Sequence, residues 1–390
     1  MDFETIKKDA QSSFMPTYQR FEIAPVKGKG ATLQDAGGRE FIDFTSGIGV
    51  NSLGYSHDEW VKAVSNQAAA LQHISNLYYN SAQTQLAKTL CGRSGYDAVF
   101  LANSGAEANE CALKLARKYS FDNYGPGRGT VLSLQNSFHG RTLATIIATG
   151  QEEYHQYFLP FPEGFRYTPA NDIALLDEAT TSDVCALIIE FIQGEGGVLP
   201  LEPGFVQAAK ALCDEKDVLL IADEVQTGIG RTGKFFAREH FGIKPDVLTS
   251  AKGLGNGLPI GACLCTAQLS GVLSPGTHGS TFGGNPVACA GAKVVLDYLT
   301  DDVLRDITEK GEYLKAELEK LSEVEFVRGK GLMLAAGLKN KKAKEVAATC
   351  VEKGLLVLTA KECLRFLPPL VVTYDEIDKG IKILADVLEQ

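Results

Sequence analysis

The chain has 390 residues, of which 45% are apolar and 22% are charged, as in a globular protein too long for one ordinary core. Its net charge of −10, with no basic tract, argues against nucleic acid or an anionic membrane as a partner. No apolar run reaches the roughly 18 residues of a membrane span, and the charged start is not signal-like, so we expect a cytoplasmic protein.

The nine cysteines are scattered along the chain and form no CxxC pair. An odd, scattered set is atypical of a disulfide framework or of a zinc site. We therefore expect structural thiols in a reducing compartment, and no bound metal.

The first fifty residues contain two glycine turns and predict an arm with short strands that joins a small domain. From residue 51 to 284 we expect a large, doubly wound α/β domain that binds a cofactor. Short β-rich runs alternate there with helical patterns, and several runs are apolar throughout, as in strands covered on both faces. The predicted strands are Ala98–Ala102, Thr130–Leu134, Ala186–Glu190, Val218–Ala222, Asp246–Ser250 and Ala262–Thr266.

Residues 285–390 have a different character and predict a smaller α+β domain. Helical patterns occupy about 286–298, 301–321, 341–353 and 374–388, and short strands are expected near 324–337, 355–360 and 364–367.

The segment after the first predicted strand has the pattern of a helix start. Ser104 is followed three residues later by Glu107, which is a capping box, so a helix should begin near Gly105. The free N–H groups of its first turn could bind a phosphate, and glycine permits a close approach. For the box alone, a plain capped helix without a ligand is the favoured explanation.

Two apolar runs end in ionisable residues. Lys252 follows Val247–Ala251 and precedes a glycine-rich loop, while Asp223 ends Val218–Ala222, 29 residues earlier. That gap fits a strand, a crossover and a second strand, which would place both side chains at one edge of a parallel sheet. Burial depresses the pKa of a lysine and frees its amine to attack a carbonyl. The pair suggests pyridoxal phosphate, whose ring nitrogen needs an acidic partner, although a buried structural ion pair is the alternative.

The glycine clusters around residues 194 and 253 spell neither GxGxxG nor GxxxxGK[ST], so nicotinamide and P-loop sites are disfavoured.

Seven segments together carry a family resemblance, and they run in order along the chain. They are Asn103–Glu110, Phe138–Thr142, Gln193–Gly197, Asp223–Gly228, Ala251–Gly255, His278–Pro286 and Leu364–Pro369. With these motifs the chain resembles the class III, or ω-amino-acid, aminotransferases of the pyridoxal-phosphate fold type I group, and among them the acetylornithine subfamily most. The resemblance implies a large, mainly parallel sheet domain, a smaller α+β domain, and a homodimer with shared active sites.

The resemblance assigns the chemistry to three of these residues. Lys252 carries the cofactor and later moves a proton between the substrate carbon and the cofactor. Asp223 keeps the ring nitrogen protonated, so that the ring withdraws electrons. Gln226 is expected to hydrogen-bond the phenolic oxygen of the ring.

The remaining cofactor contacts are implied in the same way. Phe138 covers one face of the ring and Val225 the other. Gly105 and Ala106 offer backbone N–H groups to the phosphate, and Thr281 reaches the phosphate of the neighbouring subunit.

Substrate selection is expected to depend on two arginines, because a guanidinium grips a carboxylate with paired hydrogen bonds. By resemblance, Arg141 holds the carboxylate remote from the reacting amine, and Arg365 holds the α-carboxylate of glutamate. Glu195 neutralises Arg365 when an ω-amino donor is bound and swings away for glutamate. Ser280 is expected to touch the donor.

Three departures from the family pattern concern subfamily detail. Phe191 replaces a usual proline, and Gly54–Asp58 replaces a usual Gly-His-x-His-Pro turn. Ile48 stands where ornithine enzymes carry a tyrosine, which favours an acylated donor.

The expected reaction moves the δ-amino group of N2-acetylornithine to 2-oxoglutarate, giving N-acetylglutamate 5-semialdehyde and glutamate, a step of arginine biosynthesis. Alternatives of the same fold act on succinylornithine, ornithine, 4-aminobutyrate or acyl-lysine. More distant alternatives are an intramolecular aminomutase and a non-catalytic binding protein.

Overall fold

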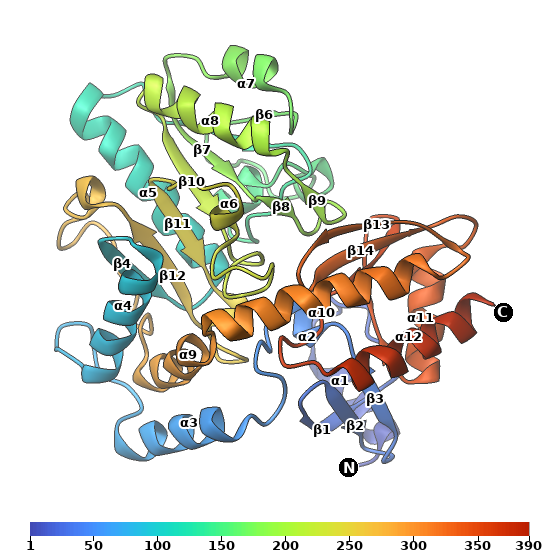
Figure 1. Ribbon diagram of the computed structural model, residues 1–390. Helices are drawn as coiled ribbons and strands as arrows, with labels where there is room; N and C mark the ends of the chain where they lie inside the picture. The colour runs from blue at the N-terminus through green and yellow to red at the C-terminus, as the bar shows by residue number, and fades with distance from the viewer. Residues whose placement is uncertain (390) are drawn as a thin grey trace.

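The computed structural model describes residues 1–389 and has two parts, a large one built on a twisted sheet and a smaller one that contains both chain ends (Figure 1). The large sheet has seven strands in the order β4-β12-β11-β10-β7-β5-β6. These strands are β4 (Ala98–Ala102), β5 (Thr130–Leu134), β6 (Phe165–Thr168), β7 (Val184–Ile189), β10 (Leu219–Asp223), β11 (Val247–Ser250) and β12 (Gly261–Cys265).

The sheet is mainly parallel, as predicted, and β12 is the strand that runs against both of its neighbours. The predicted strands match the observed ones to within two residues at each end.

Helices cover both faces of this sheet, which explains why its central strands are apolar throughout. Along β10, Leu219 and Ile221 pack into the cluster that contains helix α5 (Gly105–Tyr124). Leu220 and Ala222 point the other way, into the cluster that contains α8 (Pro203–Glu215). Helix α7 (Ile173–Ala179) packs beside α8, whereas α6 (Leu143–Ala148) contacts α5. The short strands β8 (Ile192–Gln193) and β9 (Leu199–Pro200) pair with each other after β7. A strand buried on both faces is typical of a doubly wound fold.

Three helices lie at the β4 end of the large part, below the sheet in Figure 1. They are α3 (Asp58–Ala70), α4 (Ser81–Ser94) and α9 (Pro286–Tyr298), and α9 packs on the other two.

The smaller part combines the C-terminal residues with the start of the chain. Its first sheet has the order β13-β14-β17-β16, and its second has the order β1-β2-β3-β15. Since Leu355 of β15 pairs with Ile42 of β3, the two chain ends share a sheet. The strands are β1 (Pro25–Lys29), β2 (Thr32–Asp35), β3 (Glu40–Asp43), β13 (Val324–Lys330), β14 (Met333–Leu338), β15 (Leu355–Leu356), β16 (Leu358–Ala360) and β17 (Cys363–Phe366).

The helices of the smaller part are α10 (Asp301–Glu319), α11 (Ala343–Lys353) and α12 (Tyr374–Leu388), with α1 (Phe3–Ser13) in the arm and the single turn α2 (Ser46–Gly49). The predicted helices 286–298 and 374–388 coincide with α9 and α12. Helix α1 was not predicted, and it buries none of its residues.

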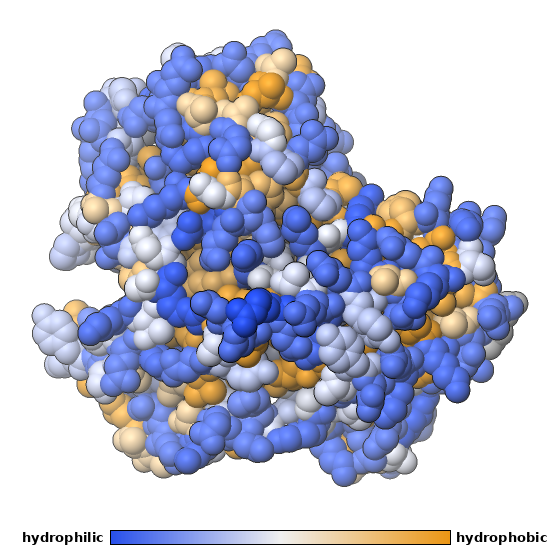
Figure 2. Space-filling view, in the orientation of Figure 1, coloured by the Kyte–Doolittle hydropathy of each residue, from blue (hydrophilic) through white to orange (hydrophobic). Residues whose placement is uncertain are grey.

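Polar and charged residues cover most of the face shown in Figure 2, where α10 crosses from one part to the other. No helix within residues 1–389 is long and apolar enough to span a membrane.

Candidate active site

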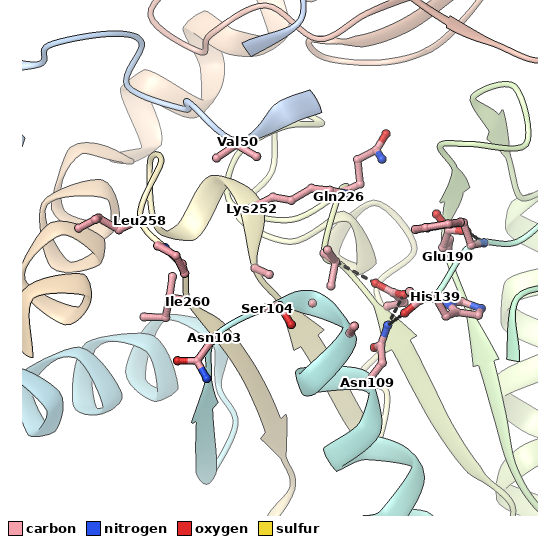
Figure 3. A pocket seen from close by; sticks show the side chains of 18 of the residues that line it. Val50, Asn103, Ser104, Asn109, His139, Glu190, Gln226, Lys252, Leu258 and Ile260 are labelled. Atoms are coloured by element: carbon pink, nitrogen blue, oxygen red, sulfur yellow. Dashed lines mark hydrogen bonds and ion pairs between the residues drawn. The ribbon is translucent and has the colours of Figure 1, made fainter. Parts of the chain in front are cut away.

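A cavity of about 310 Å³ lies where β10 and β11 end (Figure 3). Seven of the residues proposed from the sequence line it together, although they come from segments spread over about 150 residues. They are Gly105, Ala106, Phe138, Asp223, Val225, Gln226 and Lys252. The parallel pairing of β10 with β11 brings the aspartate and the lysine to one sheet edge, as predicted.

Lys252 opens the 3-10 turn that follows β11 and extends into the cavity toward Gln226 (Figure 3). Desolvation by the surrounding protein lowers the pKa of its amine, and this outweighs the opposing effect of nearby Glu195. Its backbone has φ of 42°, a left-handed conformation that is strained for a lysine. The fold therefore presents a lysine in a constrained position, with an amine that releases its proton more readily than usual.

Asp223 is fixed by three hydrogen-bond donors. One carboxylate oxygen accepts from Asn109 Nδ2 at 2.8 Å and from His139 Nδ1 at 2.7 Å, as the dashed lines in Figure 3 show. The other accepts from the backbone N–H of Val225 at 3.0 Å. Asn109 is itself oriented by Thr249, whose hydroxyl donates to its amide oxygen at 2.7 Å. This network leaves the carboxylate one orientation in the cavity.

The sequence interpretation assigned no role to Asn109 or His139. Asn109 lies one helical turn after Gly105, on the face of α5 that meets the sheet, and His139 follows Phe138 in a quoted motif. No local sequence signal marks either residue, because only the fold buries them beside the strand-end aspartate.

Glu190 is a further buried acid that lines the cavity. Its carboxylate accepts the backbone N–H of Phe138 at 2.8 Å and that of Gly194 at 3.3 Å, so it ties two segments of the site together. Desolvation raises its pKa to about 7.

This pKa predicts how the stability of the protein without added cofactor depends on pH. The folded chain keeps a proton on Glu190 from its usual pKa of 4.5 up to about 7, a range in which the unfolded chain has released it. Raising the pH through this range therefore removes stability. We expect the urea midpoint to fall between about pH 5 and pH 7, and to fall less in Glu190→Gln. An equal decline in the variant would contradict this assignment.

The N-terminus of α5 faces the cavity with two free donors. Ser104 Oγ accepts the N–H of Glu107 at 3.2 Å, which is the predicted cap. The Glu107 carboxylate, however, bonds the N–H of Asn103 at 2.6 Å, so the return bond of the box is displaced by one residue. Within the described residues the N–H groups of Gly105 and Ala106 have no partner, which suits an anion.

Gln226 and Gly105 each shape the cavity. The amide oxygen of Gln226 is buried and has no hydrogen-bond partner within the described residues. A Cβ on Gly105 would lie 2.6 Å from a methyl of Val225, so glycine lets this valine close one side of the cavity.

The proposed substrate residues lie outside the lining of the cavity. Arg365 is 3% exposed and donates from Nη1 to Glu195 at 2.7 Å. Burial alone would raise the pKa of Glu195, but the guanidinium of Arg365 more than compensates and lowers it. Arg141 is exposed at the mouth of the site.

Ser280 and Thr281 lie on the loop before α9. The hydroxyl of Ser280 accepts from Asn103 Nδ2 at 3.1 Å, which joins this loop to the start of α5. Thr281 is exposed and does not line the cavity of a single chain.

Two of the three departures from the family pattern are accommodated away from the reacting groups. Phe191 is fully buried and stacks on Phe241 with ring centroids 5.0 Å apart. Tyr55 donates its hydroxyl to buried Asp43 at 2.8 Å.

The large mixed sheet, the strand-end lysine and aspartate and the opposing helix N-terminus define a fold type I enzyme of the pyridoxal-phosphate group. The chain belongs to the class III aminotransferase family, whose profile matches residues 14–388.

Relatives of known name match over nearly their whole length. The chain is 47% identical to an acetylornithine aminotransferase of Haemophilus ducreyi over 392 residues, covering 100% of both chains. It is 49% identical to that of Caldanaerobacter subterraneus, covering 96% of this chain and 97% of the relative. A relative in Pseudomonas aeruginosa, 43% identical over 96% of this chain and 95% of its own, is named for succinylornithine as well as acetylornithine.

Solved structures show the same fold. The ornithine aminotransferase of Toxoplasma gondii superposes with a TM-score of 0.95 at 33% identity, covering 100% of this chain and 95% of its own. The N-acetylornithine aminotransferase of Stenotrophomonas maltophilia gives a TM-score of 0.85 at 34% identity, covering 98% of both chains.

Proposed function

We propose that this protein transfers the δ-amino group of N2-acetylornithine to 2-oxoglutarate, in arginine biosynthesis. The full-length relatives that carry the name acetylornithine aminotransferase support this reaction. The observation that carries the proposal is the ion pair, at 2.7 Å, between buried Arg365 and partly buried Glu195. A neutralised arginine suits a donor that has no carboxylate beside its reacting amine, and an arginine released from its partner suits glutamate.

We infer that the cavity holds pyridoxal phosphate. The free N–H groups of Gly105 and Ala106 would bind its phosphate. The side-chain NH₂ group of Gln226, which lines the cavity, would donate to its phenolic oxygen. Phe138 and Val225 would cover the two faces of the ring. When bound, this group supplies an aldehyde for the amine and a protonated ring that withdraws electrons from the substrate carbon.

The residues of the chain then divide the chemistry among them. Lys252, with its depressed pKa, takes a proton from the substrate carbon and returns it elsewhere on the reacting system. Asp223 holds a proton at the ring nitrogen, and Asn109 and His139 keep its carboxylate aimed there. Glu195 and Arg365 separate when the α-carboxylate of glutamate replaces the Glu195 side chain. Arg141 binds the carboxylate at the far end of either substrate, and Ser280 lies beside the donor.

Donor choice is testable at Ile48. This residue lies on α2, which contacts the turn of Lys252, and it is 44% exposed with φ of 66°. A β-branched residue in this conformation is strained, which marks a constrained position. In Ile48→Tyr, the larger side chain reduces the space for the acetyl group of acetylornithine. Its hydroxyl can also accept a hydrogen bond from the free α-ammonium of ornithine. We expect the ratio of kcat/KM for acetylornithine to that for ornithine to fall by about tenfold.

The measurement is a panel of acetylornithine, succinylornithine, ornithine and 4-aminobutyrate, with Ile48→Val as the matched control. Wild-type protein that prefers free ornithine would overturn the proposed donor. If Ile48→Tyr leaves the ratio of kcat/KM for acetylornithine to that for ornithine unchanged, the role of Ile48 is contradicted but the proposed donor is not.

We propose a homodimer in which Thr281 reaches the phosphate of the second copy. Thr281 is exposed, and the adjacent Phe282 is 62% exposed. Asn76 donates to the backbone of this loop and so places the exposed Leu77 and Tyr79 close to it. A cluster of exposed apolar side chains such as Leu77, Tyr79 and Phe282 is typical of an interface between subunits. We also propose a cytoplasmic location, which the nine free cysteines support.

A further inference from the structure

Arg141 is held by aromatic rings rather than by an acid. Its guanidinium carbon lies 4.2 Å from the ring centroid of Tyr154 and 5.5 Å from that of Phe138. Within the described residues no carboxylate lies within 4 Å of the Arg141 guanidinium, although 16 other pairs of a basic and an acidic side chain do meet that distance. An aromatic ring contacts the flat face of a guanidinium, so the N–H groups at the edge of the guanidinium can still bind an anion. The arginine is therefore oriented and still free to bind an anion.

Tyr154 lies in a 3-10 turn, Glu152–Tyr154, that is fastened on both sides. Before it, Gln151 Nε2 donates to the carbonyl of Ser137 at 3.0 Å. After it, His155 Nε2 donates to the carbonyl of Ile146 at 2.9 Å. The Tyr154 ring then meets Phe138 edge to face, with centroids 5.8 Å apart and planes at 73°. The ring thus has a fixed place beside the residue proposed to cover the cofactor.

The same turn is joined to the opposite wall of the site. Glu153 accepts a hydrogen bond from Lys361 Nζ at 2.6 Å, and Lys361 lies in the turn just before β17, which carries Arg365. This ion pair ties the turn that carries Tyr154 to the turn that leads into the strand of Arg365.

We propose that Tyr154 is a specificity-determining residue, which orients Arg141 so that the enzyme selects donors and acceptors with a carboxylate remote from the reacting group. This inference rests on the proposed function, because it assigns to Arg141 the distal carboxylate of both substrates. The ring holds the guanidinium plane, and a carboxylate then meets the edge of that plane with two parallel hydrogen bonds. Without the ring, the exposed side chain of Arg141 can adopt many rotamers. Substrate binding must then fix one of them, and the lost conformational entropy weakens the binding.

The test compares Tyr154→Leu, which removes the aromatic face, with Tyr154→Phe, which keeps it. The donors are N2-acetylornithine and N-acetylputrescine, which is the same molecule without the α-carboxylate. In Tyr154→Leu we expect KM for acetylornithine to rise about 5- to 20-fold, in keeping with a cation–π contact, with kcat within about threefold. The kcat/KM for N-acetylputrescine should stay within about twofold, and Tyr154→Phe should match the wild type on both donors.

Tyr157→Leu is the matched control, because Tyr157 is 81% exposed and three residues away. Tyr154→Gln provides a second variant without the ring if the leucine variant is unstable in thermal melting. An equal loss on both donors would show a purely structural role and overturn the inference, as would an unchanged KM for acetylornithine.

Binding of glutarate, measured by calorimetry, separates this inference from the proposed reaction. Glutarate carries two carboxylates and needs no turnover, and Tyr154→Leu is expected to weaken its binding about 5- to 20-fold. If the wild type binds glutarate in a Tyr154-dependent way but does not turn over acetylornithine, the proposed donor fails and the role of Tyr154 stands. If Arg141→Leu weakens glutarate binding and Tyr154→Leu does not, the role of Tyr154 fails and the proposed function stands.

Discussion

Lys252→Ala is expected to reduce turnover of acetylornithine by about 10⁴-fold or more, because it removes both the amine that holds the cofactor and the base that moves the proton. Lys252 is the lysine that lines the cavity, so we expect no other side chain to take over. The measurement combines steady-state rates with the near-ultraviolet and visible absorbance of the protein after incubation with pyridoxal phosphate.

Chemical rescue sharpens this prediction. A small primary amine, such as methylamine, fits the volume that alanine leaves and can act as the missing base, so it should restore part of the rate in proportion to its concentration. Lys234→Ala is the control, because Lys234 is an exposed lysine in a loop, and this variant should retain wild-type rates. A Lys252→Ala enzyme with unchanged turnover would rule out the mechanism.

Much of this site was predictable from local pattern. Asp223 and Lys252 each end an apolar run, and parallel strands bring their carboxyl ends to one edge, so their meeting follows from topology alone. The helix start at Gly105 follows from its cap, because capping uses residues within one turn. These inferences needed no knowledge of side-chain packing.

The polar support of Asp223 could not be predicted in this way. Asn109 and His139 reach the carboxylate across sequence separations of 114 and 84 residues. No local pattern encodes such contacts, since they depend on how α5 and the loop after β5 pack on β10. The packing of Tyr154 against Arg141 was also not predicted, because it too depends on how two segments of the chain pack on each other. The roles given to individual site residues, and the boundaries at residues 50 and 284, stay predictions.

The support of Asp223 leads to the second large effect. In Asp223→Asn, asparagine has nearly the same shape as aspartate, but its NH₂ group would replace one of the two carboxylate oxygens of Asp223. Both of these oxygens accept hydrogen bonds, and an NH₂ group cannot accept one. It would face either Asn109 and His139 or the N–H of Val225, so the amide cannot satisfy the network in either orientation. The variant also lacks the negative charge that holds a proton on the ring nitrogen. We expect kcat to fall by about 10²- to 10³-fold, the size of effect seen when one preorganised electrostatic group is lost.

His139→Leu separates charge from orientation at the same carboxylate. It keeps Asp223 ionisable but removes the donor at 2.7 Å, so we expect a smaller loss, about tenfold in kcat, with little change in KM for 2-oxoglutarate. Single-turnover absorbance changes with acetylornithine would place both losses in the proton-transfer step rather than in product release. If Asp223→Asn keeps wild-type kcat, the ring nitrogen needs no acid here. If His139→Leu lowers kcat as much as Asp223→Asn does, the aspartate contributes mainly through the orientation of its carboxylate rather than through its charge.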